Sequence, residues 1–231
     1  MGLRIATYNI HRARGHDGRE DGQRIAEVLR ELNADLIALQ EVGYNSDAPH
    51  NLLACLGGSI QADVIEGITM YNEQGHYGNA VLSRVPIPGI IRHDISVPGR
   101  EPRGAIELAI AAQGIEIQVI ATHLGLRPGE RRYQTRKLLA LLTASKADVK
   151  ILLGDLNEWF LWGRPMRWLK SEFGRPPRPA TFPARGPLFA LDCIWVHPCR
   201  ILENLHVHNS PMARAASDHL PLTADIKLDL R

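Results

Sequence analysis

The chain of 231 residues contains few cysteines and no long apolar run, and each shortage excludes a class of protein. Cys55, Cys193 and Cys199 match neither a zinc-binding spacing nor a disulfide framework, so we expect reduced thiols in the core and a cytoplasmic protein. The longest apolar candidate is Leu138 to Leu142. A membrane span needs about 18 such residues, so we expect no stable insertion into a bilayer.

The chain also has little net charge. Its 27 basic residues are 22 Arg and 5 Lys against 25 acidic residues, which gives a formal charge of +2. Proteins that hold nucleic acid by bulk attraction carry a larger basic excess, so any phosphate binding is expected to be local. The arginine bias suits bidentate phosphate contacts, but a GC-rich genome produces the same bias. Residues 1–231 are expected to form a single domain, with a monomer as the default.

Hydrophobic patterning predicts the same order of elements twice. A strand at 3–8, an amphipathic helix at 25–32 and an apolar strand at 36–39 are echoed by a strand at 115–121, a helix at 130–144 and a strand at 151–153. Further short strands are predicted at 80–82, 105–109, 191–196, 205–208 and 220–228. The pattern indicates a mixed α/β layered fold. The proline-rich stretch 174–187 reads equally as a linker or as a surface loop.

Polar residues recur at the ends of these predicted strands, where ligand sites of α/β sheets are built. They are Asn9, Glu41, His123, Asp155, Asn157, Asp192, Asp218 and His219. Each one alone is ordinary, as a strand terminator, a cap or an Asx turn. Together they supply a carboxylate for a hard metal, a base for water, donors for phosphate and a carboxylate–imidazole pair. This is the set that hydrolysis of a phosphate ester needs.

The chemistry of individual residues supports this interpretation. Glu41 offers the oxygen that Mg²⁺ prefers. Asp155 and Asn157 lie two apart on an extended segment and point the same way, so one can take a proton from water while the other donates to a phosphate oxygen. Asp192 is expected to orient His219.

The motifs resemble those of the endonuclease/exonuclease/phosphatase superfamily in order and spacing, over residues 3–222. They are Thr-Tyr-Asn9-Ile, Leu-Gln-Glu41-Val, Tyr77-Gly-Asn-Ala-Val-Leu-Ser-Arg, Arg103-Gly-Ala, Thr-His123-Leu, Gly-Asp155-Leu-Asn157, Leu-Asp192-Cys-Ile and Ser-Asp218-His219-Leu-Pro. The resemblance implies a four-layer α/β sandwich, with two mixed β-sheets packed face to face and helices outside.

The resemblance also implies roles for these residues. Glu41 would be the principal ligand of Mg²⁺, with Mn²⁺ as an alternative, and Asn9 and Asp218 would hold the metal or its waters. Asp155 would activate the attacking water. The remaining side chains would hold or orient the scissile phosphate: Asn157, His123, His219, Asp192 and Arg103.

Two features depart from the family pattern or lie outside it. Pancreatic-type members support the first histidine with a carboxylate, whereas the nearest counterpart here is Asn79, so His123 is expected to be a weaker cation than His219. Trp159, Trp162 and Trp168 follow Asn157 closely, with Arg164 and Arg167 interleaved. They could bind bases, lipid or a choline-like group, or bury Trp162 in a short helix. We take Trp159 as a candidate substrate contact.

These patterns lead to one functional prediction and its alternatives. The prediction is a metal-dependent phosphoesterase that hydrolyses a phosphodiester, in nucleic acid or phospholipid, by in-line attack of water activated by Asp155. One alternative is a phosphomonoesterase acting on a small phosphorylated molecule. The other is a non-catalytic module that binds phosphorylated ligands.

Overall fold

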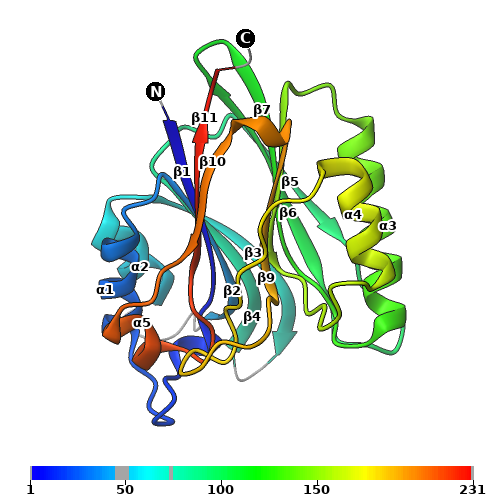
Figure 1. The fold of residues 1–231 in the computed structure, drawn as a ribbon. Helices are drawn as coiled ribbons and strands as arrows, with labels where there is room; N and C mark the ends of the chain where they lie inside the picture. The colour runs from blue at the N-terminus through cyan, green and yellow to red at the C-terminus, as the bar shows by residue number, and fades with distance from the viewer. Residues whose placement is uncertain (1, 45–51, 73–74, 230–231) are drawn as a thin grey trace.

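The computed structural model describes residues 2–44, 52–72 and 75–229, which form two β-sheets packed face to face with helices on both outer sides (Figure 1). The first sheet has the order β10-β11-β1-β2-β4-β3 and the second β5-β6-β7-β8-β9. The strands are β1 (Gly2–Asn9), β2 (Leu36–Tyr44), β3 (Asp63–Asn72), β4 (Gly75–Ser83), β5 (Gly89–Asp94), β6 (Gly104–Ala112), β7 (Ile115–His123), β8 (Val149–Asp155), β9 (Asp192–His197), β10 (Leu202–Val207) and β11 (Leu222–Lys227).

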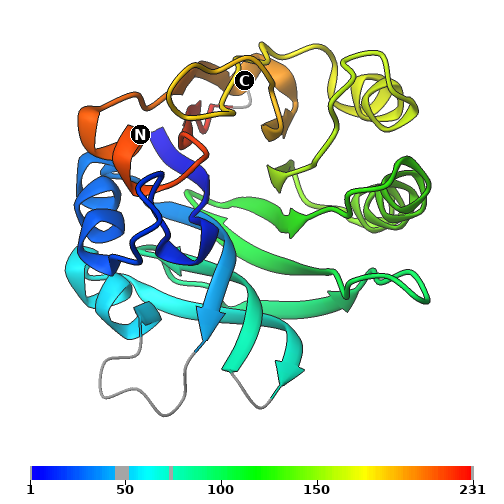
Figure 2. The same ribbon diagram turned by 90° about the horizontal axis from the view of Figure 1, so that it is seen from below.

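Five α-helices cover the sheets within the described ranges. They are α1 (Gly22–Leu32), α2 (Leu52–Ile60), α3 (Pro128–Ala144), α4 (Arg164–Phe173) and α5 (Pro211–Ala216). Figure 2 shows α1, α2 and α5 outside the first sheet, and α3 and α4 on the opposite side, outside the second. Short 3₁₀ turns lie at His11–Ala13 and Cys199–Ile201.

Each sheet is built around one parallel pair of strands joined through a helix. β1 pairs in parallel with β2 across α1, and β7 pairs in parallel with β8 across α3, while the other pairings are antiparallel. Helix α1 begins where the Asp21 side chain accepts from the backbone N–H groups of Gln23 and Arg24. The repeated strand–helix–strand order predicted from the sequence is therefore confirmed.

Three apolar cores separate the four layers. Ile5, Leu36 and Val119 belong to the core between the two sheets. Val28 and Leu29 of α1 pack on the outer face of the first sheet, with Leu56 of α2 in the same cluster. Leu138 of α3 and Leu169 of α4 pack on the second sheet. Each fully buried side chain of this size contributes about 1.5–3 kcal/mol to the stability of the fold, so the cores hold both sheets in one arrangement. The four layers confirm the predicted α/β sandwich.

Several sequence expectations need correction. Of the three thiols, only Cys193 is buried, whereas Cys55 and Cys199 are exposed. Segment 174–187 packs on the molecule as a loop and not as a linker, because Thr181 and Ala184 are buried and Ala184 donates its N–H to the Asp218 carbonyl. Trp162 is 73% exposed and precedes α4, which buries other residues. Within residues 2–44, 52–72 and 75–229 no helix is long and apolar enough to cross a bilayer.

The strand directions bring distant residues to one rim. β1, β7 and β8 end at this rim, and β9 begins there because it runs antiparallel to β8. Gly2 pairs with Lys227 at the other end of the sandwich, which places both termini away from the rim (Figure 1). Figure 2 looks onto the rim from below.

Candidate active site

Three polar side chains occupy the same level on neighbouring strands of the second sheet. His123 at the end of β7 pairs in register with Asp155 at the end of β8, which pairs in turn with Asp192 at the start of β9. All three are buried. The strand ends therefore concentrate two carboxylates and an imidazole in one row.

The backbone around Asp155 allows little variation. Gly154 has φ of +142°, and a Cβ at this position would lie 1.8 Å from the carbonyl oxygen of Thr122, so no other residue fits. Asn157 has φ of +50°, a conformation that asparagine tolerates better than most residues. Its N–H donates to Oδ1 of Asp155 at 2.8 Å, which closes a tight turn after β8 and fixes the carboxylate.

A β-bulge sets the direction of Glu41. The pairing of β2 with β4 shifts register between Leu39 and Val42, and Glu41 has φ of +56°. Bulges often re-aim a side chain beside a functional site, and strained backbone of this kind gathers at such sites. Here the bulge lets Glu41 line the rim pocket although its neighbours in the strand are buried.

The amide of Asn9 joins the two sheets. Its Nδ2 donates to Oε1 of Glu41 and to Oδ2 of Asp155, both at 3.1 Å, while its Oδ1 accepts from the N–H of His11 at 3.1 Å. The carboxylates at 41 and 155 are therefore neighbours bridged by one nitrogen. Asn9 presents a donor to them, so its geometry suits orientation of the carboxylates better than the metal-ligand role expected from the sequence.

Oδ2 of Asp155 is the point where the site converges. Besides the Asn9 amide, it lies 3.5 Å from Nε2 of His123 and 3.8 Å from Nε2 of His219. The other oxygen is held by the N–H of Asn157. One oxygen is thus fixed by the backbone and the other faces a pocket between two imidazoles.

His219 is paired with a buried carboxylate. Its Nδ1 lies 2.8 Å from Oδ2 of Asp192, which also accepts from the Thr181 hydroxyl at 2.6 Å. Burial lowers the pKa of His219, but the hydrogen bond and charge of Asp192, with the charges of Asp155 and Asp218, outweigh it and raise this pKa to about 10. The ring is therefore an imidazolium at neutral pH, as the sequence predicted from Asp192.

His123 has the opposite environment. Arg103 donates from Nη1 to Nδ1 of this ring at 2.9 Å, and Nδ2 of Asn157 lies 2.9 Å from Nε2. Burial lowers the pKa of His123 to about 3, together with the Arg103 charge and against the charge of Asp155. With nitrogen donors facing both ring nitrogens, a second ring proton is strongly disfavoured.

The support expected from Asn79 is therefore wrong. The Asn79 amide donates to the carbonyl oxygen of Gly104 at 3.4 Å, and the group on Nδ1 of His123 is the Arg103 guanidinium. This bond crosses from β4 in the first sheet to β6 in the second, so the buried Asn79 amide is directed at the facing sheet and not at the His123 ring. The expectation that His123 is a weaker cation than His219 agrees with both pKa values, but the causes are burial of the His123 ring and, after it, the charge of Arg103.

A pocket of about 660 Å³ opens over these groups. Its lining includes both signs of charge. Arg12 and Arg14 come from the loop after β1, and the ring of Tyr77 lies 4.6 Å from the Arg12 guanidinium. The predicted site residues that line it are Glu41, Arg103, His123, Asp155, Asn157 and His219. Asp218 lies beside it, with Oδ1 3.6 Å from Nδ1 of the lining residue His11.

Trp159 is linked to the site through other aromatic rings. Its ring contacts Phe189 at 4.7 Å and Phe182 at 5.9 Å, and the Phe182 ring lies 4.8 Å from that of His219. Phe182 and Thr181 are not among the site residues predicted from the sequence. Both lie in the proline-rich segment, where no periodicity marks a buried residue, and only the fold carries them to His219.

Comparisons with known proteins identify the family of this chain. The model of the Endonuclease/Exonuclease/phosphatase family matches residues 6–219. The chain belongs to this family. A curated relative, Uncharacterized protein YbhP of Escherichia coli K12, is 31% identical over 98% of this chain and 96% of its own length.

Solved structures of the endonuclease/exonuclease/phosphatase fold extend the likeness. A structure from Beutenbergia cavernae, described as an endonuclease/exonuclease/phosphatase, is 25% identical with a TM-score of 0.78, over 98% of this chain and 72% of that one. The mannosyl-6-phosphatase Bt3783 of Bacteroides thetaiotaomicron has a TM-score of 0.71 at 18% identity, over 96% and 98% of the two chains, and shows the fold alone.

Members of the endonuclease/exonuclease/phosphatase family are phosphoester hydrolases, and its enzymes generally depend on a divalent metal. Among the residues that the structure describes, two sets of candidate ligands lie at the pocket. Asp155, Asp192 and His219 offer atoms within 4.8 Å of one another, but Nδ1 of His219 already binds Asp192 as an ion pair. Glu41 lines the pocket with a carboxylate oxygen and is less buried than these residues. The hard oxygen of Glu41 therefore suits Mg²⁺ better than the imidazole cluster does.

Proposed function

We propose that this chain is a divalent-metal-dependent phosphoesterase that hydrolyses a phosphodiester by direct attack of water on phosphorus. The observation that carries the proposal is the position of Asp155. Its Oδ2 faces the pocket between a cationic His219 and a neutral His123, and it shares a donor with Glu41. A carboxylate held in this way can take a proton from water beside groups that stabilise an anionic phosphate.

The metal would be held by Glu41, with Asp218 close enough to hold its waters. When bound, Mg²⁺ or Mn²⁺ would neutralise charge on the phosphate oxygens and orient the substrate. This assignment keeps the roles predicted for Glu41 and Asp218. Asn9 takes a different role, since its amide nitrogen holds the carboxylates of Glu41 and Asp155 in their relative positions.

The protein groups complete the displacement. Asp155 Oδ2 accepts the proton of the attacking water as the new P–O bond forms and the bond to the leaving oxygen breaks. Nε2–H of His219 donates to a nonbridging phosphate oxygen, where its positive charge compensates the charge that develops. Asp192 keeps this ring protonated and oriented through the hydrogen bond to Nδ1.

His123 acts differently from the direct phosphate contact expected from the sequence. Its nitrogens contact Arg103 and Asn157, and both of these residues line the pocket. We assign His123 a positioning role, in which Nδ1 of the neutral ring accepts from Arg103 and holds its guanidinium toward the phosphate, while Nε2 carries the single ring proton beside Asn157 and Oδ2 of Asp155. Arg103 and Asn157 then supply donors to phosphate oxygens.

The experiment is hydrolysis of bis-p-nitrophenyl phosphate with Mg²⁺, with Mn²⁺ and with excess EDTA. We expect activity only with metal, and losses of at least about 10²-fold in Asp155→Asn and Glu41→Gln. Glu116→Gln makes the same carboxylate-to-amide change at the exposed start of β7 and should retain full activity. Activity that persists in Asp155→Asn would refute the proposal.

The same assay separates the alternatives. Faster hydrolysis of p-nitrophenyl phosphate than of the diester would identify a monoesterase. Metal-dependent thermal stabilisation without turnover of DNA, RNA, phospholipids or inositol phosphates would identify a non-catalytic binding module.

A further inference from the structure

An exposed apolar segment directly follows the tight turn after β8 that contains Asp155 and Asn157. Trp159, Phe160, Leu161 and Trp162 are 40%, 51%, 47% and 73% exposed, although they are four consecutive large apolar residues. Leu126, which the Arg131–Glu158 pair ties to this segment, is 63% exposed. Soluble domains rarely expose such clusters unless a partner covers them. We refer to these five residues as the aromatic patch.

Contacts connect the members of the patch. Arg131 is buried and donates from Nη1 to the Leu126 carbonyl at 2.5 Å and from Nε to Glu158 at 3.2 Å. Glu158 accepts from the N–H of Phe160 at 3.3 Å, and the Phe160 ring lies 5.3 Å from that of Trp162. The loop after β7 and the loop after β8 are therefore tied together through one buried ion pair.

Hydrogen bonds to two backbone carbonyls also fix the conformation of this segment. The N–H of Gly163 donates to the Phe160 carbonyl at 2.8 Å, and Nζ of Lys170 donates to the Leu161 carbonyl at 3.1 Å. These bonds close a turn whose side chains point outward. The exposure is thus part of the fold of this loop.

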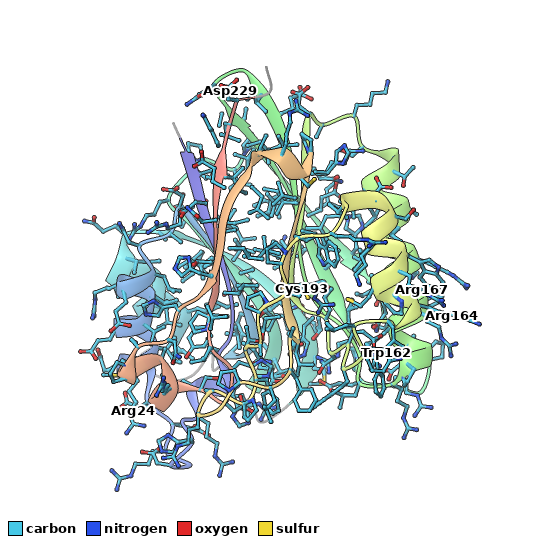
Figure 3. The ribbon with its side chains drawn as sticks, in the orientation of Figure 1. Arg24, Trp162, Arg164, Arg167, Cys193 and Asp229 are labelled. Atoms are coloured by element: carbon cyan, nitrogen blue, oxygen red, sulfur yellow. The ribbon has the colours of Figure 1, made fainter. Side chains whose placement is uncertain are left out.

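The two helices next to the patch expose mainly positive charge. α3 contains one acidic residue, the buried Glu130, and α4 contains one, the half-buried Glu172. Figure 3 shows Trp162, Arg164 and Arg167 together on the outer side of α4. The guanidinium of Arg136 on α3 lies 4.8 Å from the Trp168 ring on α4, which places the two basic faces side by side. The exposed or half-buried basic side chains of α3 and α4, with Arg127 at the start of α3, are Arg127, Arg132, Arg136, Lys137, Arg164, Arg167 and Lys170.

We propose that the aromatic patch and the basic faces of α3 and α4 dock this protein on the surface of an anionic lipid bilayer. Trp and Phe with Leu on one side and Arg or Lys around them form the composition that inserts at the headgroup boundary. Nucleic acid fits less well, because Leu126 and Leu161 offer no ring for stacking bases. A formal charge of +2 also limits attraction to a long polyanion, whereas a membrane surface meets only this face.

The patch is continuous with the pocket. Leu126 lines the pocket as well as the patch, and the Trp159 ring leads through Phe182 to His219. Docking would therefore hold the pocket mouth at the level of lipid headgroups. This consequence depends on the proposed phosphoesterase function, but the docking itself does not.

Binding is measured without hydrolysis, so that a failure of docking and a failure of catalysis are distinguishable. The full chain is sedimented in EDTA with phosphatidylcholine vesicles and with vesicles that contain 30% phosphatidylglycerol, roughly the level at which a polybasic face responds to surface charge. We expect binding mainly to the anionic vesicles. We also expect quenching of tryptophan fluorescence by brominated acyl chains, because interfacial side chains reach the acyl boundary.

Two matched pairs of variants test the surface. Phe160→Ser with Trp162→Ser should weaken vesicle binding about tenfold or more, whereas Ile91→Ser, at an exposed apolar residue of β5, should not. Arg164→Gln with Arg167→Gln should weaken binding, and Arg30→Gln with Lys227→Gln should not. Circular dichroism and thermal melts confirm that the variants fold.

Three results would overturn the proposal. They are the absence of binding to anionic vesicles, equal binding by the patch variants, and a single-stranded oligonucleotide that binds more tightly than vesicles and loses affinity in the patch variants. Because wild-type quenching by brominated lipid needs no substitution, a misfolded variant cannot leave the proposal unanswered.

Discussion

Arg103 donates from Nη1 to Nδ1 of His123 at 2.9 Å, so a permanent cation occupies the position where a carboxylate would support an imidazolium. The pKa values of the two histidines in the pocket therefore shift in opposite directions, because burial and Arg103 lower that of His123 while Asp192 outweighs burial at His219. His219 has the Asp192 carboxylate and a pKa raised to about 10, while His123 has Arg103 and a pKa lowered to about 3. One ring carries charge to the phosphate and the other positions its neighbours.

The first prediction concerns the pKa of His123. In the metal-free protein, the Cε1–H resonance of His123 should not titrate between pH 5 and pH 9, a window around the usual histidine pKa of about 6.5. Arg103→Gln should raise the pKa of His123, because it removes a nearby positive charge. Arg100→Gln, a change at an exposed neighbour, should leave it unaltered. A wild-type His123 that titrates near its usual pKa would contradict the assignment.

The second prediction is the pH dependence of stability in EDTA. The folded pKa of His219 is raised, so its contribution is complete below the unfolded value of about 6.5 and is lost as the pH rises toward 10. The folded pKa of His123 is lowered, so its contribution is present above about 6.5 and is lost as the pH falls toward 3. Between pH 6.5 and pH 9, urea unfolding should show a free energy that falls by up to about 1.4 kcal/mol per pH unit.

His219→Gln should remove most of this alkaline decline. A wild-type free energy of unfolding that rises above pH 7 would contradict the raised pKa of His219. An alkaline decline in the free energy of unfolding that persists unchanged in His219→Gln would contradict it as well.

The third prediction concerns Asp192. Asp192→Asn removes the charge that raises the pKa of His219, so kcat at pH 8 should fall by about 10²-fold and recover partly at lower pH, where the ring protonates again. Thr181→Val removes the hydroxyl donor to Asp192 and should reduce kcat about tenfold, with little change in KM. Thr223→Val, a buried change away from the pocket, is the control. A pH–rate profile of Asp192→Asn with the wild-type shape would exclude this role.

The fourth prediction concerns the buried pair of Arg131 and Glu158, which are 2% and 4% exposed. Arg131→Met or Glu158→Gln alone leaves an uncompensated buried group, so each should destabilise the fold by about 3–5 kcal/mol. The double variant should be less destabilised than the sum of the two, as a urea-unfolding cycle would show. Asp225→Asn breaks the half-exposed pair with Arg4 and should cost no more than about 1 kcal/mol. Additive losses of unfolding free energy would indicate that Arg131 and Glu158 do not stabilise each other.

The sequence predicted the fold well where hydrophobic periodicity was clear. The apolar stretches that end in Asn9, His123 and Asp155 are strands, and the polar residues at their ends lie together on one rim. Periodicity failed elsewhere. α2 carries the pair Gly57 and Gly58 and is weakly amphipathic, and β5 is an edge strand with an exposed face. The sequence patterns of α2 and β5 do not distinguish this helix and this strand from a loop.

The partners within the site were less predictable than its members. The sequence pointed to Asp192 as the partner of His219, because Asp218 and His219 face opposite ways in an extended segment and a different carboxylate is then needed to orient the ring. It did not show that Arg103 would reach His123 instead of Asn79, because this choice depends on how the two facing sheets bring their side chains together. Thr181 comes from a proline-rich loop, and only long-range packing brings it to Asp192. Local pattern therefore identifies the residues, while the fold decides which atoms meet.

The most direct test of the account is the anomalous signal from crystals soaked in Mn²⁺. If Glu41 holds the metal, we expect one strong peak in the pocket, at about 2.1 Å from a carboxylate oxygen of Glu41, and its disappearance in Glu41→Gln. A peak seated instead among Asp155, Asp192 and His219, or no peak beside Glu41, would contradict the assignment of these residues to one metal-dependent centre.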